Sequence, residues 1–487
     1  MAEHCTPSRD RRPLRIRAGA PGAAPSPWLP RLAAALQGVD GVELVASGSA
    51  AAADIVLDTG EAGAPVVRGS ERRWAIVDAK HRLLAGDAAW WCSLSQAQGV
   101  DMTLIEEAAG GWCALRRSHA TGPLAQGDGL QEAHAALVAM LVQALVDVRL
   151  GVAPDAGCLL PAPRPPVRRG AWLSRLQSRW ARGLRRQRSR WLTEHWRVGV
   201  VDQPIHALLQ AETMPPIQWL TPPDDAGYWA DPFGMPGHPG LLFCERYDER
   251  TSLGHLECLR LHGSRIEVAG RLPVGRGHAS FPNVFEADGQ VYGLAETAAD
   301  RECVLHRVGP QGQWVPVATV LHGVAAADPA IFRWQGRWWL AFTDLDRGTW
   351  DNLCLYHAER IEGPWRPHLN NPVKVDVAGA RMAGGCFEHE GRLYRPGQDC
   401  RAGYGHALAL YRVDEVGPAH YRETLVRRLA PHARGEAPEG LHTLTAWGER
   451  TLVDGKKLRF NLLALRLKLG RRSTQGRQAG PAVQKGI

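Results

Sequence analysis

The second half of the chain repeats one short phrase five times, and this repeat constrains the fold more than any other feature. In each copy an apolar anchor stands four residues before a glycine, or five in the first copy, and a strand-like apolar run follows. A glycine turn between two apolar runs predicts a β-hairpin. Five copies, each about 50 residues long and so able to form a four-stranded sheet, predict a five-bladed β-propeller. The anchors are Met235, Phe285, Phe332, Phe387 and Leu444.

The rest of the chain makes this an α+β multidomain protein. Residues 1–150 alternate short strand-like and helical runs and predict a small N-terminal α/β domain. Residues 151–197 start as a Pro-rich spacer and continue as an Arg- and Trp-rich amphipathic run, which predicts a basic helical linker. We expect the C-terminal all-β propeller over 198–464 and a basic disordered tail over 465–487.

The net charge of +8 is concentrated in the linker. Between Arg164 and Arg197 stand eleven arginines and one acid, Glu194, so the remainder of the chain is close to neutral. That distribution argues against a nucleic-acid-binding protein. A basic helix with Trp predicts contact with an anionic membrane surface through residues 168–192. The alternative is an inter-domain helix with a solvated Arg face.

The cysteines and the N-terminus bear on location. Ten cysteines are scattered without C-x-x-C spacing, which is neither a zinc pattern nor a disulfide framework. The N-terminus has charges but no apolar core of a signal peptide, and the longest apolar run, residues 135–146, is too short to span a bilayer. We expect a cytoplasmic protein, or one peripheral to the inner face of the membrane, with no metal and no cofactor.

The repeats also place polar residues around one mouth of the propeller. The innermost strand of each blade lines the central channel, so residues just before each anchor converge. By register these are Asp231, Ser280 with Asn283, Asp328, Arg381 and His442. A second ring of acids stands at the end of the following strand: Glu245, Glu296, Asp344, Asp399 and Asp454.

Two interpretations of these acids remain open. An Asp before Pro caps a strand, and an acid at a strand end bonds backbone N–H groups; recurrence in every blade favours this role. Carboxylates from different blades that face one funnel also suit glycoside cleavage, provided their pKa values are separated. The mixture of acids with Asn283, Arg381 and His442 suits a polyhydroxylated ligand.

A family resemblance covers roughly half of the chain. The phrases "YWADPF", "FPNVFEADGQVYGLAETA", "ADPAIFRWQGRWWLAFTD", "GPWRPHLNNPV", "GRLYRPGQDC" and "LHTL" resemble the five-bladed propeller at the N-terminus of plant glucosamine inositolphosphorylceramide transferases and of bacterial proteins of unassigned role. The resemblance implies a propeller accessory to a separate glycosyltransferase. We expect no such domain to follow here.

The propeller is more distantly similar to the arabinanase, xylosidase and invertase glycosidases. That similarity implies Asp231 as base or nucleophile, Asp328 as the orienting carboxylate and Glu296 as the acid. Glu362, in "IEGPW", looks more like a turn of an outer strand. The residues that would bind the substrate are Glu245, Asn283, Asp344, Arg381, Asp399 and His442.

The N-terminal region weakly resembles the formyltransferase-like domain that precedes this propeller in bacterial relatives. The Asn, His and Asp trio of formyl transfer is not found in residues 1–150, so we expect a degenerate, non-catalytic scaffold.

Three functions therefore compete. The first is a carbohydrate-active or carbohydrate-binding propeller linked to glycan or glycolipid synthesis or modification, with a sugar or glycoconjugate in the central funnel. The second is a non-catalytic platform that docks a glycosyltransferase at the membrane surface. The third is an amino-sugar formyltransferase.

Overall fold

The protein is described from a computed structural model in which the chain forms two compact units, Met1–Gly183 and Leu184–Ile487. The predicted basic tail and most of the predicted linker helix lie outside the described residues. Those residues are 12–19, 26–46, 52–59, 70–84, 89–90, 99–121, 129–152, 159–166, 192–222, 227–263 and 265–460.

The first unit contains a seven-stranded mixed sheet with two described helices, α1 (Leu29–Leu36) and α3 (Gly129–Leu150). The first four strands in spatial order run parallel and the last three pair antiparallel. In that order the strands are β2 (Val42–Val45), β1 (Leu14–Ala18), β3 (Ile55–Asp58), β4 (Arg72–Val77), β5 (Gly99–Ala108), β6 (Gly111–Thr121) and β7 (Leu159–Leu160).

Helix α3 is a core helix of this unit. Leu137, Leu141 and Leu145 recur every four residues and are fully buried, which places one apolar stripe of α3 inside the fold. Among the described helices, only α3 is long and apolar enough by length and composition to cross a membrane, and 56% of that stretch is buried within the unit.

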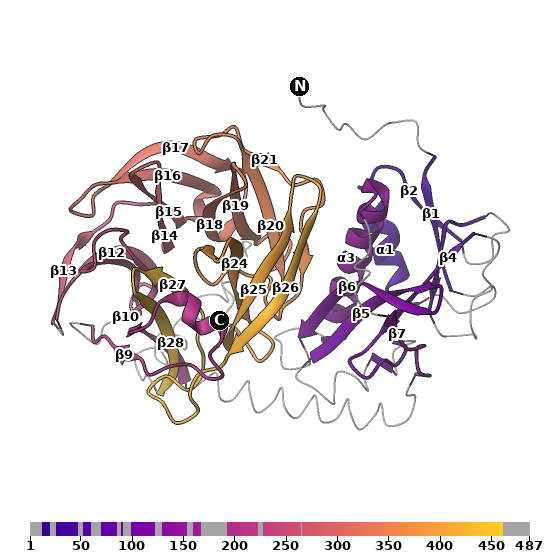
Figure 1. Cartoon of the computed structure of the whole chain (residues 1–487), viewed down its shortest axis with the longest axis horizontal. Helices are drawn as coiled ribbons and strands as arrows, with labels where there is room; N and C mark the ends of the chain where they lie inside the picture. Colours follow the sequence, from indigo (N-terminus) through magenta and orange to yellow (C-terminus); the bar gives the residue numbers. More distant parts are fainter. Residues whose placement is uncertain are drawn as a thin grey trace, which may run out of the picture. The chain divides into compact units, whose positions relative to one another are not determined.

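The second unit is a five-bladed β-propeller, which confirms the fold predicted from the repeats. Five sheets form the blades, and Figure 1 shows β14 and β18 toward the middle of the propeller and β13, β17 and β21 toward its rim. Blade 1 comprises β10 (Gly227–Gly234), β11 (Leu241–Asp248), β12 (Leu253–His262) and β13 (Arg265–Arg271). Blade 2 comprises β14 (Ser280–Ala287), β15 (Gln290–Glu296), β16 (Glu302–Val308) and β17 (Trp314–His322).

The remaining blades follow the same plan. Blade 3 comprises β18 (Ala326–Trp334), β19 (Arg337–Asp344), β20 (Asn352–Ala358) and β21 (Arg366–Pro367), and β22 (Lys374–Val375) also pairs with β20. Blade 4 comprises β23 (Phe387–His389), β24 (Arg392–Asp399), β25 (Ala407–Val416) and β26 (Tyr421–Leu429). Blade 5 comprises β27 (Leu444–Trp447), β28 (Arg450–Phe460), β8 (Leu192–Val201) and β9 (Gln218–Trp219).

The repeated glycine closes the first hairpin of a blade for a conformational reason. Gly289 and Gly336 have φ of 74° and 76°, and a Cβ at either position would meet nothing within 4 Å. The residues before them, Asp288 and Gln335, also have positive φ, 49° in both cases. Two successive positive φ angles define the type I′ turn of a tight hairpin, which glycine adopts without a steric cost.

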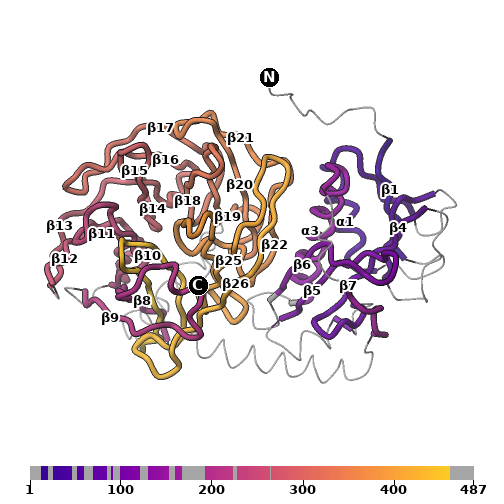
Figure 2. The backbone as a smooth tube through the Cα atoms, in the orientation of Figure 1, coloured from indigo at the N-terminus to yellow at the C-terminus, as the bar shows by residue number. Residues whose placement is uncertain are grey.

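The two ends of the propeller segment meet in blade 5. β8 pairs antiparallel with β28 along a ladder from Val201 opposite Thr451 to Leu192 opposite Phe460. The propeller strands therefore begin before residue 198, where the sequence led us to place the boundary. In Figure 2 the β8 and β9 segments and the yellow C-terminal strand lie together at the same side of the propeller. This pairing closes the ring, because first and last strands share one sheet.

We expect the ring to depend on β8. Val198 is fully buried in a cluster with Trp229 and Leu242, so Val198→Asp places an unpaired carboxylate in apolar surroundings and should cost more than about 4 kcal/mol of unfolding free energy. Val315→Asp, at a valine that is 58% exposed on β17, is the matched control and should change stability by less than about 0.5 kcal/mol. Urea unfolding of both variants measures the difference; equal losses would contradict the closure role of β8.

Candidate functional site

The inner strands of blades 1, 2 and 3 each carry a bulge at the mouth of the propeller. At these bulges Asp231, Phe281 and Asp328 have φ of 50°, 46° and 49°, and a proline follows each of them. The register with the next strand shifts at all three points. A non-glycine residue in this region of φ costs on the order of 1–3 kcal/mol, so each bulge must be held by its surroundings.

A carboxylate from the preceding blade holds each bulge. The backbone N–H of Asp231 donates to Asp454 Oδ2 at 2.9 Å. The backbone N–H of Phe281 donates to Asp231 Oδ2 at 3.3 Å, and the backbone N–H of Asp328 donates to Glu296 Oε2 at 2.9 Å. These bonds run from blade 5 to blade 1, from blade 1 to blade 2 and from blade 2 to blade 3. The acids at the mouth therefore join neighbouring blades.

Asp231 is buried in a cluster with blade 5. Thr443 Oγ1 donates to its Oδ1 at 2.7 Å, and His442 Nε2 lies 3.3 Å from the same oxygen. Burial raises the pKa of Asp231 to about 6, His442 opposes that rise, and the nearby Asp454 adds to it. Both oxygens of Asp231 are thus engaged within the protein.

His442 is clamped between the two carboxylates of this cluster. Its Nδ1 lies 2.7 Å from Asp454 Oδ1. Burial alone would lower the pKa of His442, but Asp454 and Asp231 outweigh it and raise the pKa above the ordinary value. Trp196 packs on the imidazole with ring centres 3.9 Å apart. Gly405 passes so close that a Cβ there would lie 2.8 Å from the Cβ of His442.

Asp328 is bound by blade 4. Arg381 Nε donates to its Oδ2 at 2.5 Å, and Gln398 Nε2 donates to the same oxygen at 2.7 Å. Burial raises the pKa of Asp328 to about 6, Arg381 opposes that rise, and Glu296 adds to it. Arg381 also donates through Nη1 to the backbone oxygen of Thr349 at 2.8 Å. A charged pair this well bonded fixes blade 4 against blade 3.

Aromatic rings border this cluster. The guanidinium of Arg381 lies 5.1 Å from the ring centre of Tyr404, and Trp350 stacks on Tyr404 at 6.1 Å with an interplanar angle of 29°. Trp350 and Tyr404 are both half-buried. They belong to the turns after β19 and β24, which open at the same mouth as the bulges because both turns follow second strands. Burial raises the pKa of Tyr404 well above its ordinary value, so its hydroxyl remains a donor.

The predicted second ring reaches the cluster in two blades only. Glu296 and Asp454 hold bulges as described. Glu245 instead lies beside Gly254, and its Oε1 is 3.6 Å from His278 Nε2.

Asp344 and Asp399 lie one residue beyond the positions that face the centre. Strand pairing puts Thr343 opposite Ala327, the residue before the blade 3 bulge, and Gln398 opposite Arg381. A shift of one residue turns a strand side chain to the other face. The structure accordingly does not bring Asp344 and Asp399 to the cluster: Asp344 pairs with Arg347, and Asp399 pairs with Arg401 and Arg428.

Asn283 links blade 2 to blade 3. Its Oδ1 accepts the backbone N–H of Ile331 at 2.9 Å, much as Thr445 Oγ1 donates to the backbone oxygen of Pro232 at 2.7 Å across the blade 5 to blade 1 contact. The sequence analysis did not identify several other residues at the mouth. Two signals could have found some of them: the residue directly before Asp399, and the aromatic residues in the turns that follow the second strands of blades 3 and 4. Those residues are Trp196, Trp350, Gln398, Tyr404 and Thr443.

Within the described residues, one group of side chains has the composition of a cation site. Ligand atoms of Asp231, His442 and Asp454 lie within 4.8 Å of one another. However, Asp454 Oδ1 also accepts the backbone N–H of Thr443 at 2.9 Å, and the imidazole is already bound to this oxygen. A cation would have to replace bonds that hold blade 5 to blade 1.

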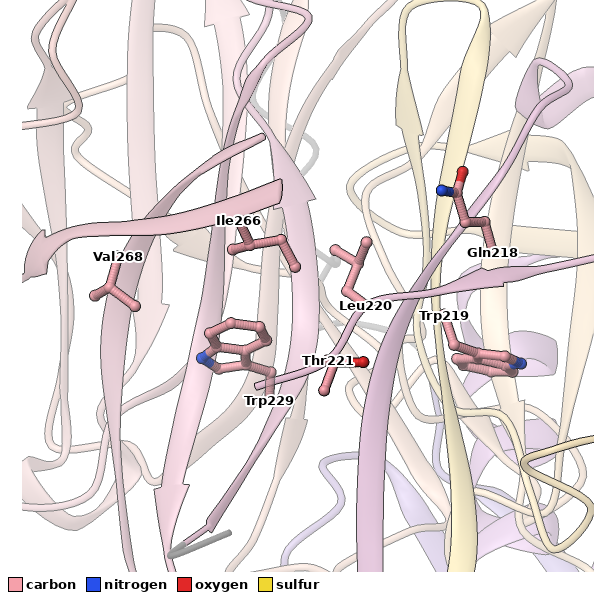
Figure 3. Close-up of a pocket in the computed structure, with 7 residues that line it drawn as sticks. All are labelled: Gln218, Trp219, Leu220, Thr221, Trp229, Ile266 and Val268. Atoms are coloured by element: carbon pink, nitrogen blue, oxygen red, sulfur yellow. The ribbon is translucent and has the colours of Figure 1, made fainter. Parts of the chain in front are cut away.

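A cavity of about 260 Å³ lies away from this cluster, where β9 of blade 5 faces β13 of blade 1. Figure 3 shows Trp229 and Ile266 on one side of Leu220 and Trp219 on the other. The Trp229 side chain is fixed in position, because its Nε1 donates to Glu257 Oε2 at 2.8 Å. None of the predicted site residues lines this cavity.

The comparison with known proteins confirms the resemblance for the propeller. Residues 267–438 match the family described as glucosamine inositolphosphorylceramide transferase 1, N-terminal. The enzyme of that name from Oryza sativa subsp. japonica is 31% identical over 223 residues, which are 43% of this chain and 30% of the rice protein. The Arabidopsis thaliana protein is 29% identical over 211 residues, which are 41% of this chain and 27% of that protein. The chain thus spans less than a third of the curated relatives it matches.

Two solved glycosidase structures align with part of the chain at low similarity. An exo-β-1,3-galactanase from Clostridium thermocellum aligns with a TM-score of 0.34 and 9% identity, over 44% of this chain and 53% of that chain. An α-L-arabinofuranosidase from Podospora anserina aligns with a TM-score of 0.37 and 11% identity, over 47% and 81%. At such identities no chemistry is transferred to this chain. The formyltransferase-like character of the first unit stays a prediction.

We expect the Asp328–Arg381 pair to behave as a coupled unit. Arg381→Met leaves a buried carboxylate with Gln398 as its remaining side-chain donor, and should cost about 3–5 kcal/mol of unfolding free energy. The double variant Arg381→Met with Asp328→Asn removes the charge as well and should recover a large part of that loss. Urea denaturation of the wild type, the two single variants and the double variant gives the four unfolding free energies of a double-mutant cycle. Additive losses would contradict the coupling.

We also expect the His442 cluster to weaken as the pH rises. A histidine with a raised folded pKa contributes stability that is complete below its unfolded pKa, ordinarily about 6.5, and that disappears as the pH passes the folded pKa. The difference in Tm between wild type and His442→Gln should therefore be largest below about pH 6.5 and shrink as the pH rises through the raised folded pKa of His442.

His357→Gln is the control for this pH dependence. Burial, helped by Arg337 and Arg366, lowers the pKa of His357, so its contribution changes with pH in the opposite direction. A Tm difference for His442→Gln that grows with pH would overturn the assignment.

Proposed function

We propose that the propeller binds a sugar or glycoconjugate at the mouth described above without cleaving it, and that it serves the synthesis or modification of a glycan or glycolipid. The matched relatives are named as glucosamine inositolphosphorylceramide transferases, which supports a carbohydrate-related role. The observation that carries the proposal is that the carboxylates of the mouth are bonded between blades, beside the half-buried aromatic pair Trp350 and Tyr404.

The commitment of the acids argues against hydrolysis. A hydrolase needs one carboxyl to deliver a proton and a second to reach water or the sugar carbon. Asp231 has both oxygens bonded within the protein. Asp328 Oδ2 accepts from two side chains, and Glu296 uses one oxygen on the backbone of the next blade. Moving Asp231 or Glu296 toward a substrate would release a strained bulge, and moving Asp328 would break its bonds to Arg381 and Gln398.

The aromatic pair offers what a sugar requires. Trp350 and Tyr404 present flat apolar rings that a sugar face can cover. Arg381, beneath Tyr404, and the Tyr404 hydroxyl supply hydrogen-bond donors for ring oxygens and hydroxyls. Binding sites for small polar ligands commonly combine apolar walls with a few such fixed polar groups.

Glycan binding by matched variants tests the proposal. Trp350→Ala should weaken binding of glycan-array ligands by at least about tenfold, which corresponds to the loss of about 1.4 kcal/mol of stacking. Tyr292→Ala removes one ring of the stacked Phe285–Tyr292 pair on blade 2 and should leave binding unchanged. No glycan binding by the wild type, or equal effects of the two variants, would contradict the proposal.

Glycoside hydrolysis is the second candidate, and one observation favours it. Burial raises the pKa values of Asp231 and Asp328 to about 6, a range in which a carboxylic acid can donate a proton near neutral pH. Activity of the wild type on a panel of glycosides, lost in Asp231→Asn and Glu296→Gln at unchanged Tm, would establish this function. We expect no turnover.

The predicted partners and location remain proposals. Docking of a glycosyltransferase and attachment to the inner face of the membrane through residues 168–192 would be tested by deleting that segment and measuring release from anionic vesicles. Binding of a folate cofactor to residues 1–150 would be needed to support the amino-sugar formyltransferase.

A further inference from the structure

The two strands that close the propeller extend past the mouth as a ribbon. In blade 2 the second strand, β15, runs toward the mouth and ends at Glu296, which holds a bulge there. In blade 5 the second strand, β28, continues beyond Asp454 to Phe460, and β8 pairs with it over that length. At the usual rise of a strand these residues reach about 20 Å past Asp454. We call residues 192–197 and 455–460 the ribbon.

The far end of the ribbon is two-stranded and exposed. β9 pairs with β8 at Gly199 and Val200, and the segment before β27 pairs with β28 as far as Lys456. In the described part of the chain, the end of the ribbon beyond these contacts therefore consists of two strands. Phe460 at this end is 58% exposed, and Arg459 is exposed too. An isolated pair of strands is only marginally stable in water, so a surface that covers this end would stabilise it.

The ribbon carries an excess of positive charge. Its residues include four Lys or Arg and one acid. Lys457 lies among like charges: burial lowers its pKa, Arg197 and Arg459 lower it further, and Glu436, which pairs with Arg197, opposes the change. Cations crowded in this way favour an anionic partner.

The chain on either side of the ribbon adds to this charge. Leu192 lies opposite Phe460, so the segments before and after the ribbon leave the propeller side by side. Residues 168–191 contain nine Arg, residues 461–487 contain six Lys or Arg, and neither segment contains an acid. Residues 461–470 also contain five Leu. Leucines interspersed with basic residues suit the surface of an anionic bilayer, which offers both phosphate groups and an apolar phase, better than a nucleic acid.

We propose that the ribbon is a docking surface for an anionic lipid bilayer, to which the basic residues of 461–487 add charge. Lys457 and Arg459 meet the lipid phosphates, and Phe460 lies at the boundary between headgroups and acyl chains. This surface extends the proposed attachment through residues 168–192 to the mouth side of the propeller. Docking therefore turns the mouth toward the bilayer, within reach of sugars carried by lipids. That consequence rests on the proposed function, whereas the docking does not.

Sedimentation of the full chain with phosphatidylcholine vesicles, with and without phosphatidylserine, tests the docking. We expect binding only to vesicles that contain phosphatidylserine, and weaker binding as the salt concentration rises. The double variant Lys457→Glu with Arg459→Glu should weaken binding at least about tenfold. Its Tm should be nearly unchanged, because a glutamate at 457 would face Arg197.

A second variant and a control complete the experiment. Arg471→Glu with Arg472→Glu changes the tail alone and should also weaken vesicle binding, so the test does not depend on the folding of the ribbon variant. Arg265→Glu with Arg360→Glu makes the same change in net charge at exposed arginines beside the turns between third and fourth strands, at the face opposite to the mouth. This control should bind vesicles as the wild type does.

Hydrogen exchange of the full chain with bound vesicles locates the docking surface. We expect exchange to slow at residues 455–460 and to stay unchanged at the hairpin turns 288–289 and 335–336, which lie at the opposite face. Trp350→Ala should leave vesicle binding intact, because these vesicles carry no sugar. Loss of glycan binding with vesicle binding retained would thus reject the proposed function alone.

The docking proposal is overturned if vesicles with phosphatidylserine do not bind the wild type, if neither the ribbon variant nor the tail variant weakens binding, or if the control variant weakens it equally. An RNA oligonucleotide that binds where vesicles do not would assign the basic surface to nucleic acid instead.

Discussion

The propeller depends on carboxylates that cross from one blade to the next and accept the backbone N–H of a strained bulge. Asp454, Asp231 and Glu296 do this in succession around the mouth. A buried carboxylate is unfavourable unless it is hydrogen-bonded, and a non-glycine residue at positive φ is unfavourable unless its surroundings hold it. Each bond offsets both costs at once. The blades are therefore positioned by electrostatics at the mouth and by apolar packing below it.

This arrangement explains why several buried acids at one mouth need not be catalytic. The acids of three blades hold the backbone of a neighbouring blade, while blade 4 supplies Arg381 and Gln398, which neutralise and bind Asp328. Phe281 occupies the blade 2 bulge where blades 1 and 3 have Asp. Trp350 and Tyr404 lie half-buried beside these acids, and the proposed recognition of a sugar face rests on this pair.

The repeat could be recognised in the sequence because the residues that form a hairpin turn are adjacent in the chain. In four of the five copies the glycine after the anchor has a positive φ and specifies the hairpin whatever surrounds it, so the repeated anchors predicted the blades. Asp231, Asp328, Arg381 and His442 were also placed together by register alone. Asp344 and Asp399 were placed at the mouth wrongly. The register had been inferred from the positions of the acids, and successive side chains of a strand point to opposite faces. The bulges before the anchors shift that register and leave no mark in a single sequence beyond the proline that follows.

The amino-acid sequence by itself determined the number of blades, the hairpin turns and the acids that stand near the mouth, since these follow from short-range pattern and backbone conformation. Only the tertiary structure decided what the acids do. Whether a carboxylate binds a neighbouring backbone, an arginine or a ligand depends on which groups of other blades come within hydrogen-bond distance. For Asp231 those partners are Thr443 and Phe281, 212 and 50 residues away in the chain, and no local pattern relates them.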